Sequence, residues 1–161
     1  MAFESVTDIK IAELISIHKK VVNSAARSKT KDGHEQYNYK VKSVGSDDYE
    51  FELYTRQNLR EGMEDDFSCG ISWLAPNGES FTLRRYNGLS HIHPNRLENE
   101  KLEYVCHVHK ATEKYIKANL KATGYAEKTE SYDTLKGALH CLVHDCNISG
   151  IATEQDLPKL F

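Results

Sequence analysis

The chain has 161 residues, of which 39% are hydrophobic and 28% are charged. This length suits one domain with one core, and the apolar content is too high for a disordered chain. The formal net charge of −3 provides no overall basic field for long nucleic acids, although cations can still gather at a local site. We therefore expect a single domain that spans residues 1–161.

The start of the chain and its cysteines indicate the compartment. Residues 1–4 show neither the basic start nor the apolar run of a secretory signal, and no stretch approaches the ~20 apolar residues of a membrane span. We expect a cytoplasmic protein without membrane contact. In that reducing compartment the thiols of Cys69, Cys106, Cys141 and Cys146 should be free and structural.

The first predicted element is a helix over Asp8–Ala26, which Thr7 or Ser5 can cap. Apolar residues and one histidine recur at helical spacing along one side of it. They are Ile11, Leu14, Ile15, His18 and Val22. The polar stretch from Arg27 to Gln36 predicts a loop.

Alternating apolar residues then predict antiparallel strands. Residues 37–53 should form a hairpin around a turn at 45–48. After a charged loop at 60–66, residues 67–86 should form a second hairpin around Asn77-Gly78, a dipeptide typical of tight turns.

A further strand is predicted from Leu102 to His109, and we expect it to pair with the strand over Phe81–Tyr86. Side chains alternate along a strand, so His107 and His109 should share one face and Cys106 should take the other. The two histidines should leave the apolar side, so their replacement need open no cavity in the core.

Two helices are expected near the end of the chain. A short one covers Ala111–Leu120, and a long one begins at the cap Ser131 and ends near Cys146. The apolar stripe of the long helix includes Leu139 and Leu142, which should be deeply buried. The tail over 150–161 should be peripheral. Helix, antiparallel strands and helix in this order indicate the α+β class.

Histidines concentrate in one segment of the sequence. Four of the eight lie in two His-x-His pairs, namely His91, His93, His107 and His109. If the strands that carry them are neighbours, the four imidazoles should converge beside Arg84 or Arg85 and Tyr86.

These residue types suit RNA cleavage by the 2′-hydroxyl group. Histidine titrates near ~6.5 and can act as acid or base at cellular pH. Arg84 or Arg85 could hold the phosphate through a planar, permanently charged fork, and Tyr86 could donate a proton or stack on a base. The chemistry requires no metal.

Other interpretations stay open. Three or four histidines, or histidines with Cys106, are suitable zinc ligands, although the spacing matches no familiar zinc motif. His140 and His144 lie four residues apart on the last helix and form a second candidate ligand pair or an ordinary solvated face. The central histidines could also be structural. No phosphate-binding glycine loop and no nucleophile elbow is present.

The stretch LRRYNGLSHIHPN, followed by CHVH, resembles the core of the TumE-type family of bacterial toxins and a related set of uncharacterised small bacterial proteins. The resemblance covers about residues 81–148. It matches Arg85, Tyr86 and Asn87 to an Arg-Tyr-Asp segment of the family. The histidine pairs at 91–93 and 107–109 match the family's two histidine clusters, with His-Ile-His in place of adjacent histidines.

The resemblance implies a RelE-like or barnase-like fold, in which a curved antiparallel β-sheet packs against an N-terminal and a C-terminal helix. It also implies a ribonuclease that acts on RNA, with Asn87 beside the arginines in substrate binding and an antitoxin or host protein as a partner.

Three hypotheses follow. The first is a toxin-like ribonuclease that cleaves RNA by metal-independent acid and base catalysis. The second is a non-enzymatic inhibitor or binding protein of phage or mobile-element origin, which the acidic loop of Glu61, Glu64, Asp65 and Asp66 favours. The third is a zinc-binding module.

Overall fold

The computed structural model describes residues 6–23, 28–31, 33–45 and 47–151. One large sheet contains β1 (Lys19–Val21), β2 (Ser28–Lys31), β3 (His34–Ser43), β4 (Glu50–Asn58), β5 (Phe67–Leu74), β6 (Ser80–Asn87), β9 (His107–Lys110), β10 (Tyr125–Lys128) and β11 (Ile148–Ser149). The remaining elements are β7 (Ile92–Asn95) and β8 (Glu100–Glu103), which form a two-stranded sheet, and the helices α1 (Asp8–Ser16), α2 (Glu113–Lys117) and α3 (Leu135–Asp145).

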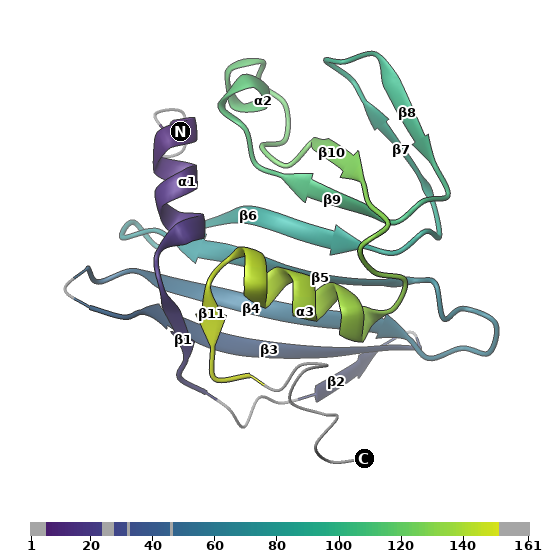
Figure 1. Ribbon diagram of the computed structural model, residues 1–161, viewed down its shortest axis with the longest axis horizontal. Helices are drawn as coiled ribbons and strands as arrows, with labels where there is room; N and C mark the ends of the chain where they lie inside the picture. The colour runs from purple at the N-terminus through teal and green to yellow at the C-terminus, as the bar shows by residue number, and fades with distance from the viewer. Residues whose placement is uncertain (1–5, 24–27, 32, 46, 152–161) are drawn as a thin grey trace.

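The large sheet is mostly antiparallel (Figure 1). Its strands follow the order β10-β9-β6-β5-β4-β3-β1-β11, and β2 pairs with β3 outside this path. Only the short β1–β11 pair among the described strands is parallel. The predicted α+β class is confirmed.

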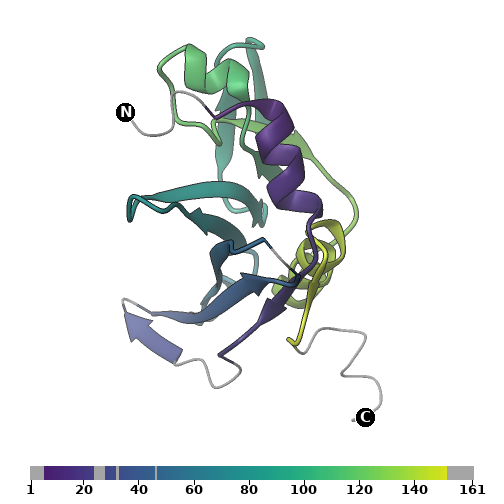
Figure 2. The same ribbon diagram turned by 90° about the vertical axis from the view of Figure 1, so that its left-hand side faces the viewer.

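Helices α1 and α3 cover the same face of the sheet (Figures 1 and 2). Each begins at a threonine whose side chain accepts a backbone N–H of the first turn, Thr7 for α1 and Thr134 for α3. The core between helices and sheet includes Ile11, Leu14, Phe51, Leu53, Ile71, Leu83, Ala138 and Leu142. The opposite face of the sheet carries neither helix.

The first helix is shorter than predicted, because it ends at Ser16 and the chain continues into β1. Lys19 provides the physical reason. Its side chain is buried, and Nζ donates to the carbonyl oxygens of Ile15, Ile17 and Cys146 at 2.8, 2.9 and 2.7 Å. The ammonium group thus satisfies carbonyls at the ends of α1 and α3. Residues 24–26 of the predicted helix lie outside the described part.

Both predicted hairpins are confirmed. β3 and β4 pair on either side of the turn near Gly45, and β5 and β6 pair around Asn77-Gly78. Gly78 has a φ of +88°, a backbone conformation that glycine adopts without strain. The predicted loop over 27–36 is wrong in part, because residues 28–31 form β2 and β3 begins at His34.

The predicted strand over 102–109 is two strands. Tyr104 interrupts it with a φ of +51°, so Leu102 pairs with His93 in the β7–β8 hairpin and only β9 pairs with β6. The short helix is confined to α2. β10 was not expected, because four residues with one buried side chain produce no detectable alternation.

The last helix begins after Thr134 rather than at Ser131. Leu142 is fully buried, as predicted, but Leu139 is only half-buried at the margin of the core. All four cysteines are free thiols. Within the described ranges no helix is long and apolar enough to cross a membrane. Most of the tail lies beyond the described residues.

Candidate functional site

The register of β6 and β9 decides which predicted site residues meet. Arg85 pairs with His109, and Asn87 pairs with His107. Directly paired residues of antiparallel strands lie on the same face, so these four side chains share one face of the sheet. It is the face opposite to α1 and α3, because the intervening Tyr86 contacts α3.

The β7–β8 hairpin brings the first histidine pair onto this face. The ring of His93 lies 4.5 Å from that of His109 and 5.8 Å from that of His107, centroid to centroid. The ring of His91 lies 5.2 Å from that of His107, and the rings of His107 and His109 lie 5.0 Å apart. The predicted convergence of the four imidazoles, here named the histidine cluster, is confirmed.

Side-chain bonds to the β10 segment fix the hairpin in place. His93 Nε2 lies 2.7 Å from the carbonyl oxygen of Gly124 and therefore donates to it. The buried Asn95 side chain forms both hydrogen bonds with the backbone of Ala126, at 2.7 and 2.8 Å. Asn95 thus occupies the outer edge of β10 as a neighbouring strand would.

Two backbone carbonyls determine which ring nitrogens carry hydrogen. Nδ1 of His107 donates to the oxygen of Val105 at 2.8 Å, and Nδ1 of His109 donates to the oxygen of Thr123 at 2.9 Å. In a neutral imidazole the other nitrogen, Nε2, is then an acceptor. Nε2 of His107 is buried and has no hydrogen-bond partner in the described structure.

The two buried histidines of the cluster, His107 and His109, are neutral at cellular pH. Burial lowers the pKa of His109 to about 3, and the charge of Arg85 acts in the same direction. Burial also lowers the pKa of His107. Both rings therefore favour the uncharged form. His91 is exposed and His93 is half-buried, so these two form the solvent side of the cluster.

Arg85 is the arginine of this face. Gly70 on β5 provides the space for it, because a Cβ atom there would lie only 3.1 Å from Arg85 Cγ and 2.8 Å from a ring carbon of Tyr54. Nε of Arg85 is buried without a hydrogen-bond partner among the described groups. The charge of Arg85 lowers the pKa of Lys121, which places a second cation nearby.

Arg84 and Tyr86, two of the predicted site residues, lie on the other face. The Tyr86 hydroxyl donates to Asp145 at 2.7 Å, and Arg84 Nη1 donates to the same hydroxyl at 3.3 Å. Burial raises the pKa of Tyr86 far above its usual range. The hydrogen bonds among Arg84, Tyr86 and Asp145 join β6 to α3. The structure therefore does not bring Arg84 and Tyr86 to the histidine cluster.

His107 and His109 leave the helix-covered, apolar face of the sheet, as predicted, but the expectation that their replacement need open no cavity is wrong. His107 is 0% exposed and His109 is 3% exposed, because the hairpin covers them. Asn87 is also buried, and its Oδ1 has no partner in the described part of the chain. Replacing either buried histidine would leave a cavity and an unpaired carbonyl.

The described residues contain no group of three or more His, Cys, Asp or Glu side chains that could hold a metal ion. Cys106 is buried, and His144 is exposed on α3.

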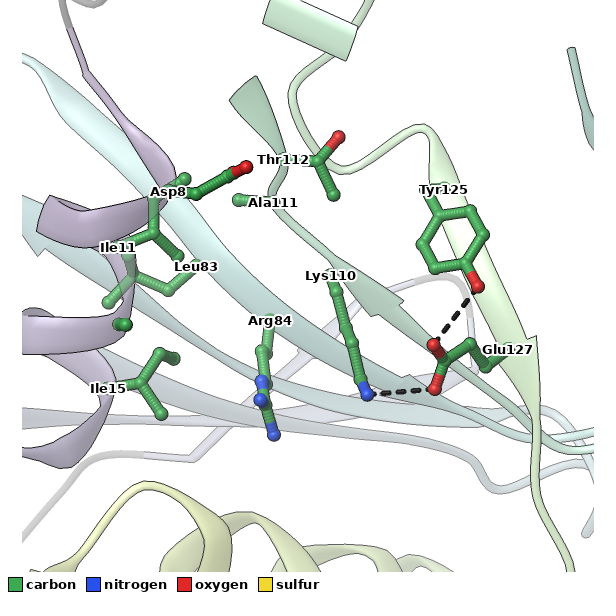
Figure 3. Close-up of a pocket in the computed structure, with 11 residues that line it drawn as sticks. Asp8, Ile11, Ile15, Leu83, Arg84, Lys110, Ala111, Thr112, Tyr125 and Glu127 are labelled. Carbon is green, nitrogen blue, oxygen red and sulfur yellow. Dashed lines mark hydrogen bonds and ion pairs between the residues drawn. The ribbon is translucent and has the colours of Figure 1, made fainter. Parts of the chain in front are cut away.

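Two pockets flank β9 and β10. The α1 pocket has a volume of about 390 Å³ and lies between α1 and the sheet (Figure 3). Arg84 and Lys110 extend into it, and Glu127 binds Lys110 at 2.8 Å and accepts from Tyr125 at 3.0 Å. The His93 pocket, about 370 Å³, lies beside the histidine cluster and is lined by His93, Pro94, Arg96, Tyr115, Leu120, Lys121 and Gly124. Sequence analysis missed Arg96 and Lys121, because no local pattern links them to the histidines.

Comparison with known proteins identifies no relative. No protein-family model, no curated protein and no solved structure matches this chain. The resemblance to the TumE-type toxins therefore rests on the motif residues alone, and the assignment of activity depends on the geometry of the site.

Proposed function

We propose that this protein is a toxin-like ribonuclease that cleaves RNA without a metal ion. One observation carries the proposal, namely the packing of three imidazoles against His107, whose Nε2 is a buried acceptor without a partner in the described structure. An unsatisfied buried polar atom costs about 1–3 kcal/mol. Groups of this kind and histidines with displaced pKa values concentrate at functional sites.

His91 and His93 are the members of the cluster that RNA can reach. Because Nε2 of His93 donates to Gly124, its Nδ1 is the acceptor in the neutral ring. We assign this nitrogen as the base that takes the proton of the 2′-hydroxyl group. His91 is exposed, so water can solvate its protonated form, and we assign it as the acid. Both rings flank His107.

The atoms and protons of the proposed reaction balance. The 2′-oxygen bonds to phosphorus as its proton passes to His93, and the bond from phosphorus to the 5′-oxygen breaks as that oxygen takes a proton from His91. The products are a 2′,3′-cyclic phosphate and a 5′-hydroxyl group. Arg85 would neutralise the charge that develops on the phosphate. His107 and His109 are positioning residues, whose neutral rings hold the reactive pair in place.

The resemblance to the TumE-type family supports the proposed role as a toxin. In TumE-type toxins the fold would be a curved, RelE-like or barnase-like sheet on two terminal helices, and the covering of one face by α1 and α3 is consistent with it. An antitoxin would be the natural partner of such a protein in the cytoplasm.

The test is RNA cleavage by the purified protein in the presence of EDTA. His91→Asn and His93→Asn should each lower the rate by about 10²–10⁴-fold and leave the circular dichroism spectrum unchanged. His144→Asn is the matched control, since this exposed histidine lies on α3 at the opposite face. Equal rates in all four proteins would refute the assigned roles.

A second candidate function is a non-enzymatic binding protein. The burial of His107 and His109 favours it, because neutral, buried histidines also serve as structural supports. An intact RNA substrate after prolonged incubation with the wild-type protein would select this alternative.

A further inference from the structure

The His93 pocket combines an apolar wall with free positive charge. The wall consists of Pro94, Leu120 and the ring of Tyr115. The hydroxyl group of Tyr115 donates to Glu98 at 2.7 Å, which fixes the ring. A Cβ atom at Gly124 would lie 2.6 Å from this ring, so glycine allows the close approach of the two segments.

Two exposed cations line the pocket. Neither Arg96 nor Lys121 forms an ion pair within the described residues, and no Asp or Glu side chain lines the pocket. The α1 pocket differs, because there Lys110 is paired with Glu127 and Arg84 lies 3.7 Å from Asp145. In a chain of net charge −3, uncompensated cations favour an anionic ligand at the His93 pocket.

The pocket adjoins the proposed reaction site. His93 belongs to both, and Gly124 accepts the hydrogen bond that orients its ring. A ligand in this pocket would therefore lie against the histidine that we assign as the base. Its volume of about 370 Å³ is within the ordinary range of small-molecule sites.

We infer that the His93 pocket binds one nucleotide of the RNA substrate, next to the scissile phosphate. The base packs on Pro94 and Leu120, as bases pack against apolar side chains in other nucleotide pockets. The phosphate of this nucleotide binds Lys121 and Arg96. The inference rests on the proposed function and adds the substrate unit that the site recognises.

The experiment measures binding of adenosine 5′-monophosphate, adenosine and inorganic phosphate to the full chain by calorimetry. The monophosphate should bind more tightly than either fragment. The double variant Arg96→Gln, Lys121→Gln should weaken its binding by about two- to thirtyfold, because it removes both charge contacts with the phosphate. Lys20→Gln removes an exposed charge at the distant β1 and should change nothing.

A monophosphate that binds no better than phosphate, or equally well to the double variant, would overturn the inference. His91→Asn separates this outcome from the proposed function, because it should lower the cleavage rate by about 10²–10⁴-fold and retain nucleotide binding. Binding without any RNA cleavage by the wild type would refute the ribonuclease and leave the nucleotide site standing. RNA cleavage by the wild type, together with equally tight nucleotide binding by the double variant, would support the ribonuclease and refute the nucleotide site.

Discussion

His93 of the β7–β8 hairpin lies edge to face against His109 of β9, with ring centroids 4.5 Å apart and ring planes at 79°. The contact joins the small sheet to the large one. It also shields His109 from water. The stability of the fold should therefore depend on pH.

Stability should fall as the pH falls below neutrality. His109 has a pKa of about 3 in the fold, against ~6.5 in the unfolded chain, so the unfolded state binds the proton first. The contribution of the neutral ring is complete above pH ~6.5 and is lost progressively toward pH ~3. Between pH 7 and pH 5 the loss should be about 2 kcal/mol, and His107 should add to it.

Urea unfolding at the two pH values measures this loss. His109→Asn keeps an N–H donor for Thr123 but cannot titrate, so its stability should change less over the same interval. An equal change in the variant and the wild type would show that His109 does not titrate in this way.

Lys19→Met should destabilise the fold by about 3 kcal/mol, because two buried carbonyls and one part-buried carbonyl lose their donor. Burial lowers the pKa of Lys19 only to about 8, so its ammonium group is charged at pH 7. Chemical denaturation at that pH measures the loss. The neighbouring variant Lys20→Met, at an exposed position, should change stability by less than about 0.5 kcal/mol. Similar stabilities of the two variants would argue against the ammonium bridge.

Two leucines of α3 should respond differently to truncation. Leu142→Ala should cost about 3 kcal/mol, as for other fully buried leucines, whereas Leu139→Ala should cost about 1 kcal/mol because Leu139 is half-buried. Thermal or urea unfolding of both variants checks the order. If Leu139→Ala were the more damaging change, the orientation of α3 on the sheet would be in error.

Asn95→Ala should loosen the hairpin. Both backbone groups of Ala126 lose their partner, so hydrogen exchange at the Ala126 amide should accelerate at least tenfold, which corresponds to about 1.4 kcal/mol. Asn77→Ala, in an exposed turn, is the control. An unchanged exchange rate at Ala126 would mean that Asn95 does not close the sheet edge.

The histidine cluster was predictable from the sequence because strands impose a period of two. His107 and His109 had to share a face, and pairing of their strand with β6 brought them beside Arg85. The choice between Arg84 and Arg85 was not predictable. It depends on which face the helices cover, and β5 and β6 also change register between Ile71 and Ser72.

Long-range contacts explain the other differences from expectation. The helical spacing of residues 11–15 continues to His18, but Lys19 ends the helix through a carbonyl 127 positions away in sequence. The hairpin of β7 and β8 has few buried residues, so its pattern resembles a loop. The burial of His107 follows from that hairpin and could not be foreseen from β9 alone.

The central claim is the use of a 2′-hydroxyl group at the histidine cluster, and a chimeric oligonucleotide tests it most directly. The substrate is DNA with one ribonucleotide, incubated with the wild-type protein in EDTA at pH 5–8, and mass spectrometry identifies the fragments. We predict cleavage only after the ribonucleotide, with a 2′,3′-cyclic phosphate on one product and a 5′-hydroxyl group on the other. An intact oligonucleotide under conditions where the protein is folded, or cleavage of the all-DNA strand, would contradict the claim.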